Sequence, residues 1–197
     1  TKLFSDKLFI AANAYTGKRG IPKFSVVRYG NVIGSRGSLL PFWKEALSQG
    51  KKSLPITDLR MTRFWISLPQ AVSFVAYISS MMQGAEIFVP KSPSVLIKDL
   101  SQALAPGIDL TVTGIRPGEK IHEVLISQDE ARTTVEGKGF YAILPQFEVH
   151  GSQKLKLPLT QKVLDEFTLA SNTNPLFTKS EEEIQKLIRG EEICTLW

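Results

Sequence analysis

Glycines and polar side chains directly follow a strand-like run near the start of the chain. Residues 24–29 (FSVVRY) are apolar and β-branched, which predicts a buried central strand. The loop after them contains Gly30, Gly34 and Gly37, with Asn, Ser and Arg between the glycines. Glycine lets a ligand approach the backbone closely, and α/β proteins bind ligands at the carboxyl ends of their strands. We therefore expect a ligand site at residues 30–38.

Two interpretations of this loop compete. In the first, the three glycines form a dinucleotide fingerprint and Asp58 binds the ribose, but their spacing departs from G-x-G-x-x-G. In the second, the loop faces a nucleotide whose main binding site lies elsewhere. The spacing favours the second interpretation.

Two arginines are surrounded by sequence that suits anion binding. Arg63 lies in the apolar segment MTRFWI, where a buried cation needs anionic partners. Arg116 precedes Pro-Gly in the loop RPGEK. A guanidinium fork matches phosphate oxygens better than an ammonium does. A structural salt bridge to Asp58 or Glu119 is the alternative for each arginine.

Composition excludes several classes of function. The chain has 197 residues, 43% hydrophobic and 22% charged, as expected for an ordinary globular domain. Its net charge of +5 comes from scattered Lys and Arg, without a nucleic-acid motif, so we predict no nucleic-acid partner. No apolar run approaches the ~20 residues that span a bilayer, so we predict no membrane partner. The histidines, His122 and His150, and the single cysteine, Cys194, lie far apart, so we predict no metal site and a reducing, cytoplasmic compartment.

Alternating helix and strand signals predict an α/β protein. Helices are expected at 1–15, from Pro41 to Gly50, at 68–82, at 97–104 and after Ser180. Strands are expected at 24–29, 54–57, 86–89, 110–114 and 140–144, with 121–126 as either type. The aromatic side chains expected in the core are Phe42, Trp43, Phe64 and Trp65. The chain begins with Thr1 inside an amphipathic pattern, so we expect that an upstream segment is missing.

Four segments, in order, resemble a known family: TKLFSDKLF, VVRYGNVIGSRGS, ITDLRMTRFWI and IRPGEKIHE. Together they resemble the extended short-chain dehydrogenase/reductases. They are most similar to the inverting UDP-N-acetylglucosamine 4,6-dehydratases of bacterial polysaccharide and flagellin-glycan synthesis. The resemblance covers residues 1–145 closely and the tail more loosely.

The resemblance implies the carboxyl-terminal part of a Rossmann-like enzyme with a small mixed α/β substrate-binding domain. Residues 1–34 would end the dinucleotide-binding sheet, 35–145 would mainly bind the UDP-sugar, and 146–197 would form a carboxyl-terminal extension. The family's glycine fingerprint, catalytic tyrosine and Thr-Asp-Lys segment are absent from this sequence. We therefore expect the isolated chain to be inactive.

For the cofactor, the resemblance implies NADP. Lys2 matches the lysine of the family's Tyr-x-x-x-Lys motif, which holds the nicotinamide ribose and lowers the pKa of the tyrosine. Tyr29, Gly30 and Val32 would lie beside the nicotinamide. From the sequence alone, the favoured interpretation of Lys2 is a solvated lysine at a frayed terminus, and the resemblance favours the functional role.

For the substrate, the resemblance implies a UDP-sugar. It places Asn31 and Ser38 on the sugar nucleotide, with Leu39 either lining that site or packing in the core. An amide offers a donor and an acceptor, although Asn31 could simply tolerate a turn.

The resemblance also assigns the charged residues. It places Arg63 and Arg116 on the diphosphate, and it assigns Glu119 to the ribose hydroxyls, since an ionised carboxylate only accepts hydrogen bonds.

The activity implied is NADP-dependent 4,6-dehydration of UDP-N-acetylglucosamine with inversion at C5, by a homo-oligomer. Alternatives are a stand-alone sugar-nucleotide-binding module, or a retaining dehydratase or 4-epimerase of the same superfamily. The segment MTRFWI favours the inverting type by resemblance alone.

Overall fold

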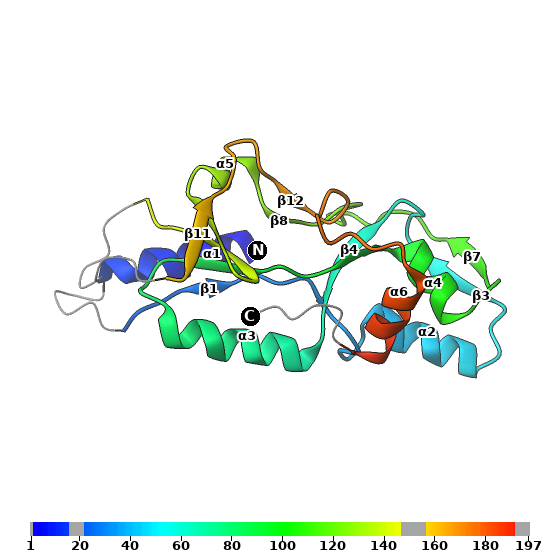
Figure 1. The fold of residues 1–197 in the computed structure, drawn as a ribbon. Coiled ribbons are helices and arrows are strands. Elements are labelled where there is room, and N and C mark those ends of the chain that lie inside the picture. Colours follow the sequence, from blue (N-terminus) through cyan, green and yellow to red (C-terminus); the bar gives the residue numbers. More distant parts are fainter. Residues whose placement is uncertain (1, 16–21, 147–156, 192–197) are drawn as a thin grey trace.

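A five-stranded sheet forms one end of the molecule (Figure 1). A computed structural model describes residues 2–15, 22–146 and 157–191. The strand order is β1 (Val26–Val27), β5 (Ile87–Pro90), β10 (Phe140–Ile143), β9 (Thr134–Gly137) and β11 (Leu159–Lys162). Strand β1 runs parallel to β5, and the other pairs are antiparallel. Every residue of β5 and β10 is buried, so these two strands form the centre of the sheet.

A strand forms within the predicted range 24–29, but the prediction that it is buried and central was wrong, and the strand is shorter than predicted. Among the described strands β1 lies at the edge of the sheet, only two of its residues pair with β5, and both are half-buried. The physical reason is that the chain leaves β5 after Arg28, whose N–H donates to the Phe88 carbonyl at 2.9 Å. It then pairs with a different strand through β2 (Asn31–Val32).

Three smaller sheets continue towards the other end of the molecule. One joins β2, β4 (Thr62–Ile66) and β6 (Ser94–Leu96), and all five residues of β4 are buried. The second pairs β3 (Ser53–Ile56) with β7 (Asp109–Val112) in parallel. The third pairs β8 (Val124–Ile126) with β12 (Leu169–Ala170) in antiparallel orientation.

The helices largely follow the predicted positions. They are α1 (Lys2–Ala12), which continues as the 3-10 turn η1 (Asn13–Tyr15), α2 (Leu39–Ser48), α3 (Leu68–Met81), α4 (Ile97–Leu104), α5 (Gln128–Ala131) and α6 (Glu181–Arg189). Ser67 and Gln70 form a reciprocal capping box at the start of α3. The Ser180 side chain accepts from Glu183 N–H at the start of α6, as predicted. No helix in the described ranges is long and apolar enough to cross a membrane.

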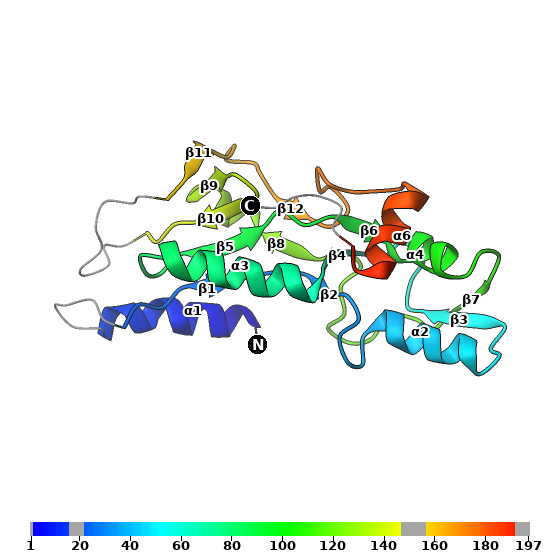
Figure 2. The ribbon, with the colours of Figure 1, turned by 60° about the horizontal axis from the view of Figure 1, so that its bottom comes forward.

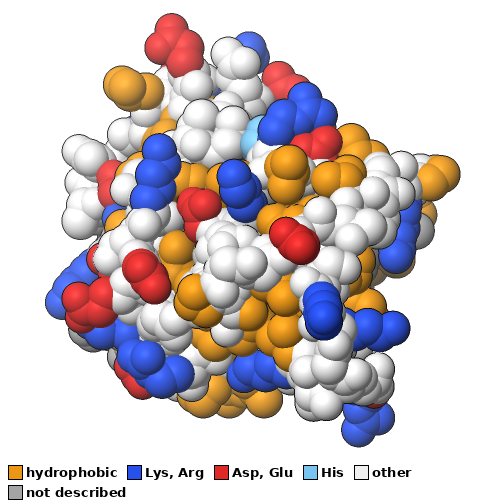
Figure 3. All heavy atoms as spheres, turned by 90° about the vertical axis from the view of Figure 1, so that its right-hand side faces the viewer, with side chains coloured by type: hydrophobic (Ala, Val, Ile, Leu, Met, Phe, Trp, Pro, Cys, Tyr) orange, Lys and Arg blue, Asp and Glu red, His pale blue; other side chains and the backbone are white. Residues whose placement is uncertain are grey.

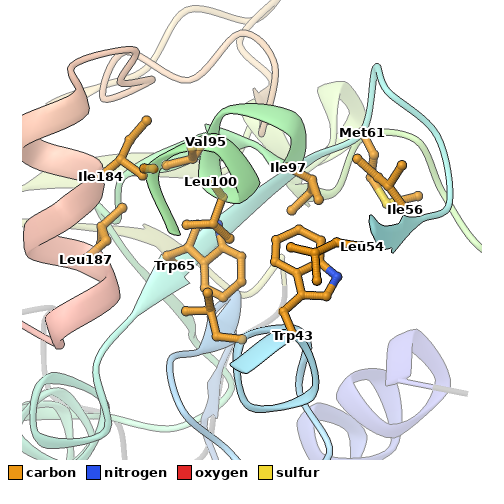
Figure 4. Packing of buried hydrophobic residues seen from close by; sticks show 12 residues of the cluster. Trp43, Leu54, Ile56, Met61, Trp65, Val95, Ile97, Leu100, Ile184 and Leu187 are labelled. Atoms are coloured by element: carbon orange, nitrogen blue, oxygen red, sulfur yellow. The ribbon is translucent and has the colours of Figure 1, made fainter. Parts of the chain in front are cut away.

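A cluster of buried hydrophobic side chains, which includes two tryptophans, packs together the helices and strands at the end opposite the five-stranded sheet (Figure 4). Trp43 from α2 and Trp65 from β4 pack with side chains of β3, α4 and α6. The Trp43 Nε1–H donates to the Pro55 carbonyl at 3.0 Å, which fixes α2 over β3. Phe42 was expected in the core but is 52% exposed, because consecutive helix residues point about 100° apart and Trp43 takes the inward direction.

Arg28 ties the first helix to the sheet. Strand β1 runs between α1 and α3 (Figure 1, Figure 2), and Arg28 follows it directly. Its Nε–H donates to Asp6 of α1 at 2.7 Å, and its two other nitrogens donate to both carboxylate oxygens of Glu130. Burial opposes the charge on Arg28, but these hydrogen bonds outweigh burial and raise its pKa.

Gly30 lets two backbone segments approach closely. A Cβ at this position would lie 2.4 Å from Phe64 Cβ and 2.6 Å from the Phe64 carbonyl oxygen, both in β4. Gly34, in the same loop, has φ +72° and no atom within 4 Å of an added Cβ. Gly30 is therefore required by packing, and Gly34 only by backbone conformation.

Gly30→Ala should lower the free energy of unfolding in urea by about 1–3 kcal/mol, because the added methyl group overlaps β4. The control is Gly34→Asn, which fills open space with a residue that tolerates positive φ and should stay within about 0.5 kcal/mol of wild type. Equal stability of Gly30→Ala and wild type would contradict the close approach.

Glu130→Gln should reduce the loss of unfolding free energy that occurs as the pH falls below about 5. Burial opposes the Glu130 charge, but hydrogen bonds from Arg28 and Ser127 outweigh burial and hold the pKa below 4.5. A carboxyl with a lowered pKa stabilises the folded state above its unfolded pKa, and this contribution is lost as the pH falls through the folded pKa. We expect urea unfolding to show a decline in wild-type stability from about pH 5 to pH 3 that is smaller in the variant.

Glu182→Gln is the matched control for this pH series. Glu182 pairs with Lys186 on the solvent side of α6, where the carboxylate is 78% exposed. Exposed pairs contribute little to stability, so this variant should keep the wild-type pH slope. A Glu130→Gln slope identical to that of the control would contradict the role of the Arg28 network.

Candidate functional site

A cavity of about 570 Å³ lies between α2, β3, β4 and the loop after β7. Figure 3 shows this end of the molecule, where acidic and basic side chains surround apolar ones. All six residues predicted to bind substrate line this one cavity: Asn31, Ser38, Leu39, Arg63, Arg116 and Glu119. The structure thus brings together side chains that lie up to 88 positions apart, from Asn31 to Glu119.

Arg63 fixes the loop that forms one wall of the cavity. Its Nη1 donates to the carbonyls of Thr62 and Ile121 at 2.7 and 3.0 Å, and its Nη2 donates to that of Lys120 at 2.8 Å. Burial lowers the pKa of Arg63, while the nearby charges of Glu123 and Glu119 raise it, and burial dominates. Most of the guanidinium donors are therefore used inside the protein.

The loop Arg116–Lys120 presents two opposite charges. Arg116 N–H donates to the Glu119 carboxylate at 3.3 Å, and Glu119 N–H donates to the Arg116 carbonyl at 3.0 Å, which makes a tight turn. The turn contains Gly118 at φ +81°, a conformation that favours glycine. Among the described residues no carboxylate pairs with the Arg116 guanidinium, and Arg116 is exposed. This guanidinium is therefore accessible to an anionic ligand.

The predicted salt-bridge alternatives have a mixed outcome. Arg63 lies 3.9 Å from Glu119 and 3.6 Å from Glu123, so the structural pairing with Glu119 is present at long range. Asp58 pairs instead with Arg60, whose hydrogen bonds lower the Asp58 pKa to about 2. Asp58 is not among the residues that line the cavity.

The other end of the cavity lies where β2 meets β4. Asn31 pairs with Trp65 in parallel register, and both line the cavity. Ser38 is the residue before α2, and its side chain makes no capping hydrogen bond. Trp65 was predicted as core and is 1% exposed, yet it also forms part of the cavity wall. The missed signal was the spacing, because Arg63 and Trp65 lie two apart on one strand and share a face.

Other lining residues were not singled out from the sequence. They are Gly37, Pro41, Phe42, Glu45, Pro55, Ile56, Thr57, Met61, Ile97 and Thr113. Thr57 donates to the Glu119 carboxylate at 3.4 Å, which orients that group in the cavity. These residues lie in short strands and helix turns without a motif, so nothing in the sequence marked them.

The residues predicted for a cofactor are not among those that line the cavity. Tyr29 is 40% exposed and lies with Gly30 in the segment after β1, and Val32 is the last residue of β2. An exposed, glycine-containing carboxyl end of a parallel strand fits one edge of a nicotinamide site. Lys2 is the first residue of α1, and its side chain lies outside the described part of the structure.

A series of hydrogen bonds holds the first residue of β4 in place. The Thr62 hydroxyl lies 2.8 Å from His122 Nδ1 and 2.6 Å from the Ser171 hydroxyl, which accepts from Glu123 N–H at 2.9 Å. This series joins β4 to the segment after β12. In the described ranges no three His, Cys, Asp or Glu side chains form a group able to hold a metal ion; His150 and Cys194 lie outside those ranges.

Comparison with known proteins gives consistent matches. The profile of the family described as "Polysaccharide biosynthesis protein" matches residues 1–145. The chain is 48% identical over 197 residues to the UDP-N-acetylglucosamine 4,6-dehydratase (inverting) of Campylobacter jejuni subsp. jejuni serotype O:2, covering 98% of this chain and 58% of that protein. It is 34% identical over 190 residues to the UDP-glucose 4-epimerase of Rickettsia massiliae, covering 83% of this chain and 55% of that protein.

A solved structure supports the fold. The X-ray structure of Pen from Bacillus thuringiensis matches with a TM-score of 0.79 and 28% identity, covering 96% of this chain and 56% of that chain. The predicted α/β class and the resemblance to inverting dehydratases are confirmed. The chain spans 58% of the length of the Campylobacter relative. Because the family profile matches residues 1–145 of 197, the chain belongs to the polysaccharide biosynthesis protein family.

Proposed function

We propose that the chain is the carboxyl-terminal part of an NADP-dependent UDP-N-acetylglucosamine 4,6-dehydratase that inverts C5, and that the cavity binds the UDP-sugar. One observation carries this proposal: six residues selected by resemblance line a single cavity beside the carboxyl end of β1. The names of the similar proteins, a dehydratase and an epimerase of UDP-sugars, support the substrate class.

Different residues of the cavity bind different parts of the UDP-sugar. Arg116, with an accessible guanidinium, binds the diphosphate, and Arg63 holds the loop that carries it. Glu119, held by Thr57, accepts hydrogen bonds from the ribose hydroxyls. Asn31 binds the sugar at the end nearest the cofactor.

The chemistry needs the sugar to be held still beside a hydride acceptor. A nicotinamide cofactor, held by Lys2, Tyr29, Gly30 and Val32, would supply the hydride acceptor for oxidation at C4 and the hydride donor for reduction at C6. Oxidation at C4 acidifies the C5 proton, so elimination across C5 and C6 follows. Asn31 and the diphosphate-binding residues keep the sugar ring in one orientation through these steps.

In this proposal the cofactor is bound by Lys2, Tyr29, Gly30 and Val32. We place residues 1–34 at the end of the dinucleotide-binding sheet, 35–145 mainly in the substrate-binding part and 146–197 in a carboxyl-terminal extension. We also propose a cytoplasmic homo-oligomer. Exposed apolar side chains on α1, such as Phe4 at 74% and Leu8 at 59%, support burial against another protein surface.

Two alternatives rest on specific observations. The 34% identity to UDP-glucose 4-epimerase favours an epimerase with the same cavity and cofactor-binding residues. The second alternative is a binding module that recognises the sugar nucleotide without chemistry, because the cavity proposed for the sugar nucleotide lies within the described residues. Analysis of the reaction product distinguishes an epimerase from a dehydratase. The coding sequence upstream of Thr1 distinguishes a binding module from part of an enzyme.

Arg116→Ala should weaken UDP-N-acetylglucosamine binding to the chain by about 10- to 100-fold in calorimetric titration, because a charge-assisted contact to the diphosphate is lost. The control is Arg60→Ala, an exposed arginine outside the cavity, which should stay within about twofold of wild type. Arg63 is unsuitable for this test, because its loss would release the loop. Equal binding by Arg116→Ala and wild type would reject the diphosphate assignment.

The isolated chain should give no 4-keto-6-deoxy product from UDP-N-acetylglucosamine and NADP, measured by NMR of the reaction mixture. The reason is that the family's catalytic tyrosine and Thr-Asp-Lys segment are not in this sequence. Fusion to the remaining amino-terminal part of the Campylobacter relative should restore product. Turnover by the isolated chain would contradict the assignment of these groups.

A further inference from the structure

We propose that Glu45 is a specificity-determining residue, which accepts a hydrogen bond from the N3–H of the uracil base where the first cavity meets a second one. The exposed ring of Phe42 packs against the same base. This inference rests on the proposed function, because it takes the ligand of the first cavity to be a UDP-sugar.

A second cavity, of about 510 Å³, lies between α2, β3 and β7. Phe42, Glu45 and Pro55 line both cavities, so the two volumes meet at these residues. Helix α2 runs beside β3 (Figure 1, Figure 2), and the hydrogen bond from Trp43 Nε1 to the Pro55 carbonyl holds the two elements together. A ligand that fills the first cavity therefore reaches the second without a change in the backbone.

Strand β3 leads from the residues assigned to the ribose towards the second cavity. Its residues Ser53–Ile56 alternate between half-buried and buried, so every second side chain faces the cavities. Thr57, which follows the strand, lines the first cavity and orients Glu119 for the ribose. Pro55, two residues earlier, lines both cavities. A step of two residues is roughly 6–7 Å, close to the separation of ribose and base in a nucleotide, so the base lies at Pro55.

Phe42 presents an aromatic ring at the place where the cavities meet. Its side chain is 52% exposed and lines both cavities. Ala46, one turn later on α2, and Pro55 add apolar surface beside it. Aromatic side chains bind nucleic-acid bases by stacking, because every base has a flat π-face. The ring of Phe42 is therefore accessible to a base in this position.

Glu45 brings a carboxylate to the same place. Among the described residues no cation pairs with it, and it accepts one hydrogen bond, from the Gln49 amide at 3.4 Å. An ionised carboxylate only accepts hydrogen bonds and repels a diphosphate, so the part of the ligand beside it must be neutral and must donate. With the ribose at Glu119 and the sugar at Asn31, the uracil ring remains. Its N3–H is its one N–H donor, because N1 is bonded to the ribose.

Donors for the uracil carbonyl groups lie in the second cavity. The Thr111 hydroxyl donates to Ser53 Oγ at 3.1 Å, which leaves the Ser53 hydrogen for a ligand. Lys51, which follows α2, adds an ammonium group to the lining. Uracil has a carbonyl oxygen on each side of N3–H, so a site that combines one acceptor with several donors matches this edge of the base.

The test compares UDP with 3-methyl-UDP, in which a methyl group replaces the N3–H. Both are titrated calorimetrically into the 197-residue chain and its variants. Wild type should bind UDP about tenfold more tightly than 3-methyl-UDP, and Glu45→Ala should bind the two equally. A ratio of two affinities cancels any general effect of the lost charge. Alanine is the strongest helix former, so this variant should keep α2 folded.

Two further variants complete the comparison. Phe42→Ala removes the ring but keeps Glu45, so both ligands should bind about tenfold more weakly and their ratio should stay as in wild type. Glu182 is an exposed carboxylate on α6 that lines neither cavity, so Glu182→Ala should bind both ligands as wild type does. Wild-type affinity in Phe42→Ala, or equal ratios in Glu45→Ala and wild type, would overturn the position of the base.

UDP labelled with ¹⁵N at N3 gives a direct readout of the hydrogen bond. Bound to wild type, the N3 imino proton should be protected from exchange with water and give an NMR signal. In the complex with Glu45→Ala this signal should be lost. A signal that persists in Glu45→Ala would assign the N3–H to another acceptor and overturn the proposal.

The same titrations distinguish this inference from the proposed function. If wild type binds UDP-N-acetylglucosamine and UDP but binds 3-methyl-UDP equally well, the role of Glu45 is overturned and the proposed function stands. If wild type binds none of the three ligands, both are overturned.

Discussion

The structure depends on a buried cation in the strand β4. Arg63 is 8% exposed, and a guanidinium there is costly unless its donors are satisfied. Its hydrogen bonds to the carbonyls of Thr62, Lys120 and Ile121 satisfy them and at the same time fix a loop to the strand. The strand, the loop and the cavity between them therefore form one unit. A neutral side chain at position 63 would leave three carbonyls and two glutamates without their common partner.

The cavity combines an apolar floor with polar walls. Its apolar lining includes Met61, Trp65 and Ile97, which belong to the buried cluster that packs α2, α4 and α6 around β4. Its charged side chains come from loops and helix turns at the rim. This division suits a ligand that has a flat base, a charged centre and a hydroxyl-rich sugar. It also keeps the charged groups partly solvated, which lowers the cost of holding them unpaired.

The sequence predicted helices better than strands, and six candidate residues chosen from the sequence line one cavity. Helix α6 was predictable because Ser180 and Gly190 are local capping signals that act within one turn. Strands β6, β9, β11 and β12 were missed, because two to four residues carry no usable periodicity and their pairing is decided by distant partners. Trp65 was assigned to the core correctly, and its spacing from Arg63 places both residues on one face of β4, but its pairing with Asn31 joins distant parts of the sequence and follows from neither segment alone.

The residues that stabilise β4 and its neighbour β6 lie far towards the carboxyl end and are synthesised much later. The hydroxyls of Thr62 and Ser171 meet across 109 positions, and Asn174 donates to Ser92 and Ser94 beside β6. Helix α6, near the end of the described chain, packs on α4. During synthesis the ribosome releases β4 long before these partners exist, so the cavity wall cannot reach its final form cotranslationally until almost the whole chain has emerged. Nascent chains stalled before residue 171 would therefore leave the strand Thr62–Ile66 open to chaperones.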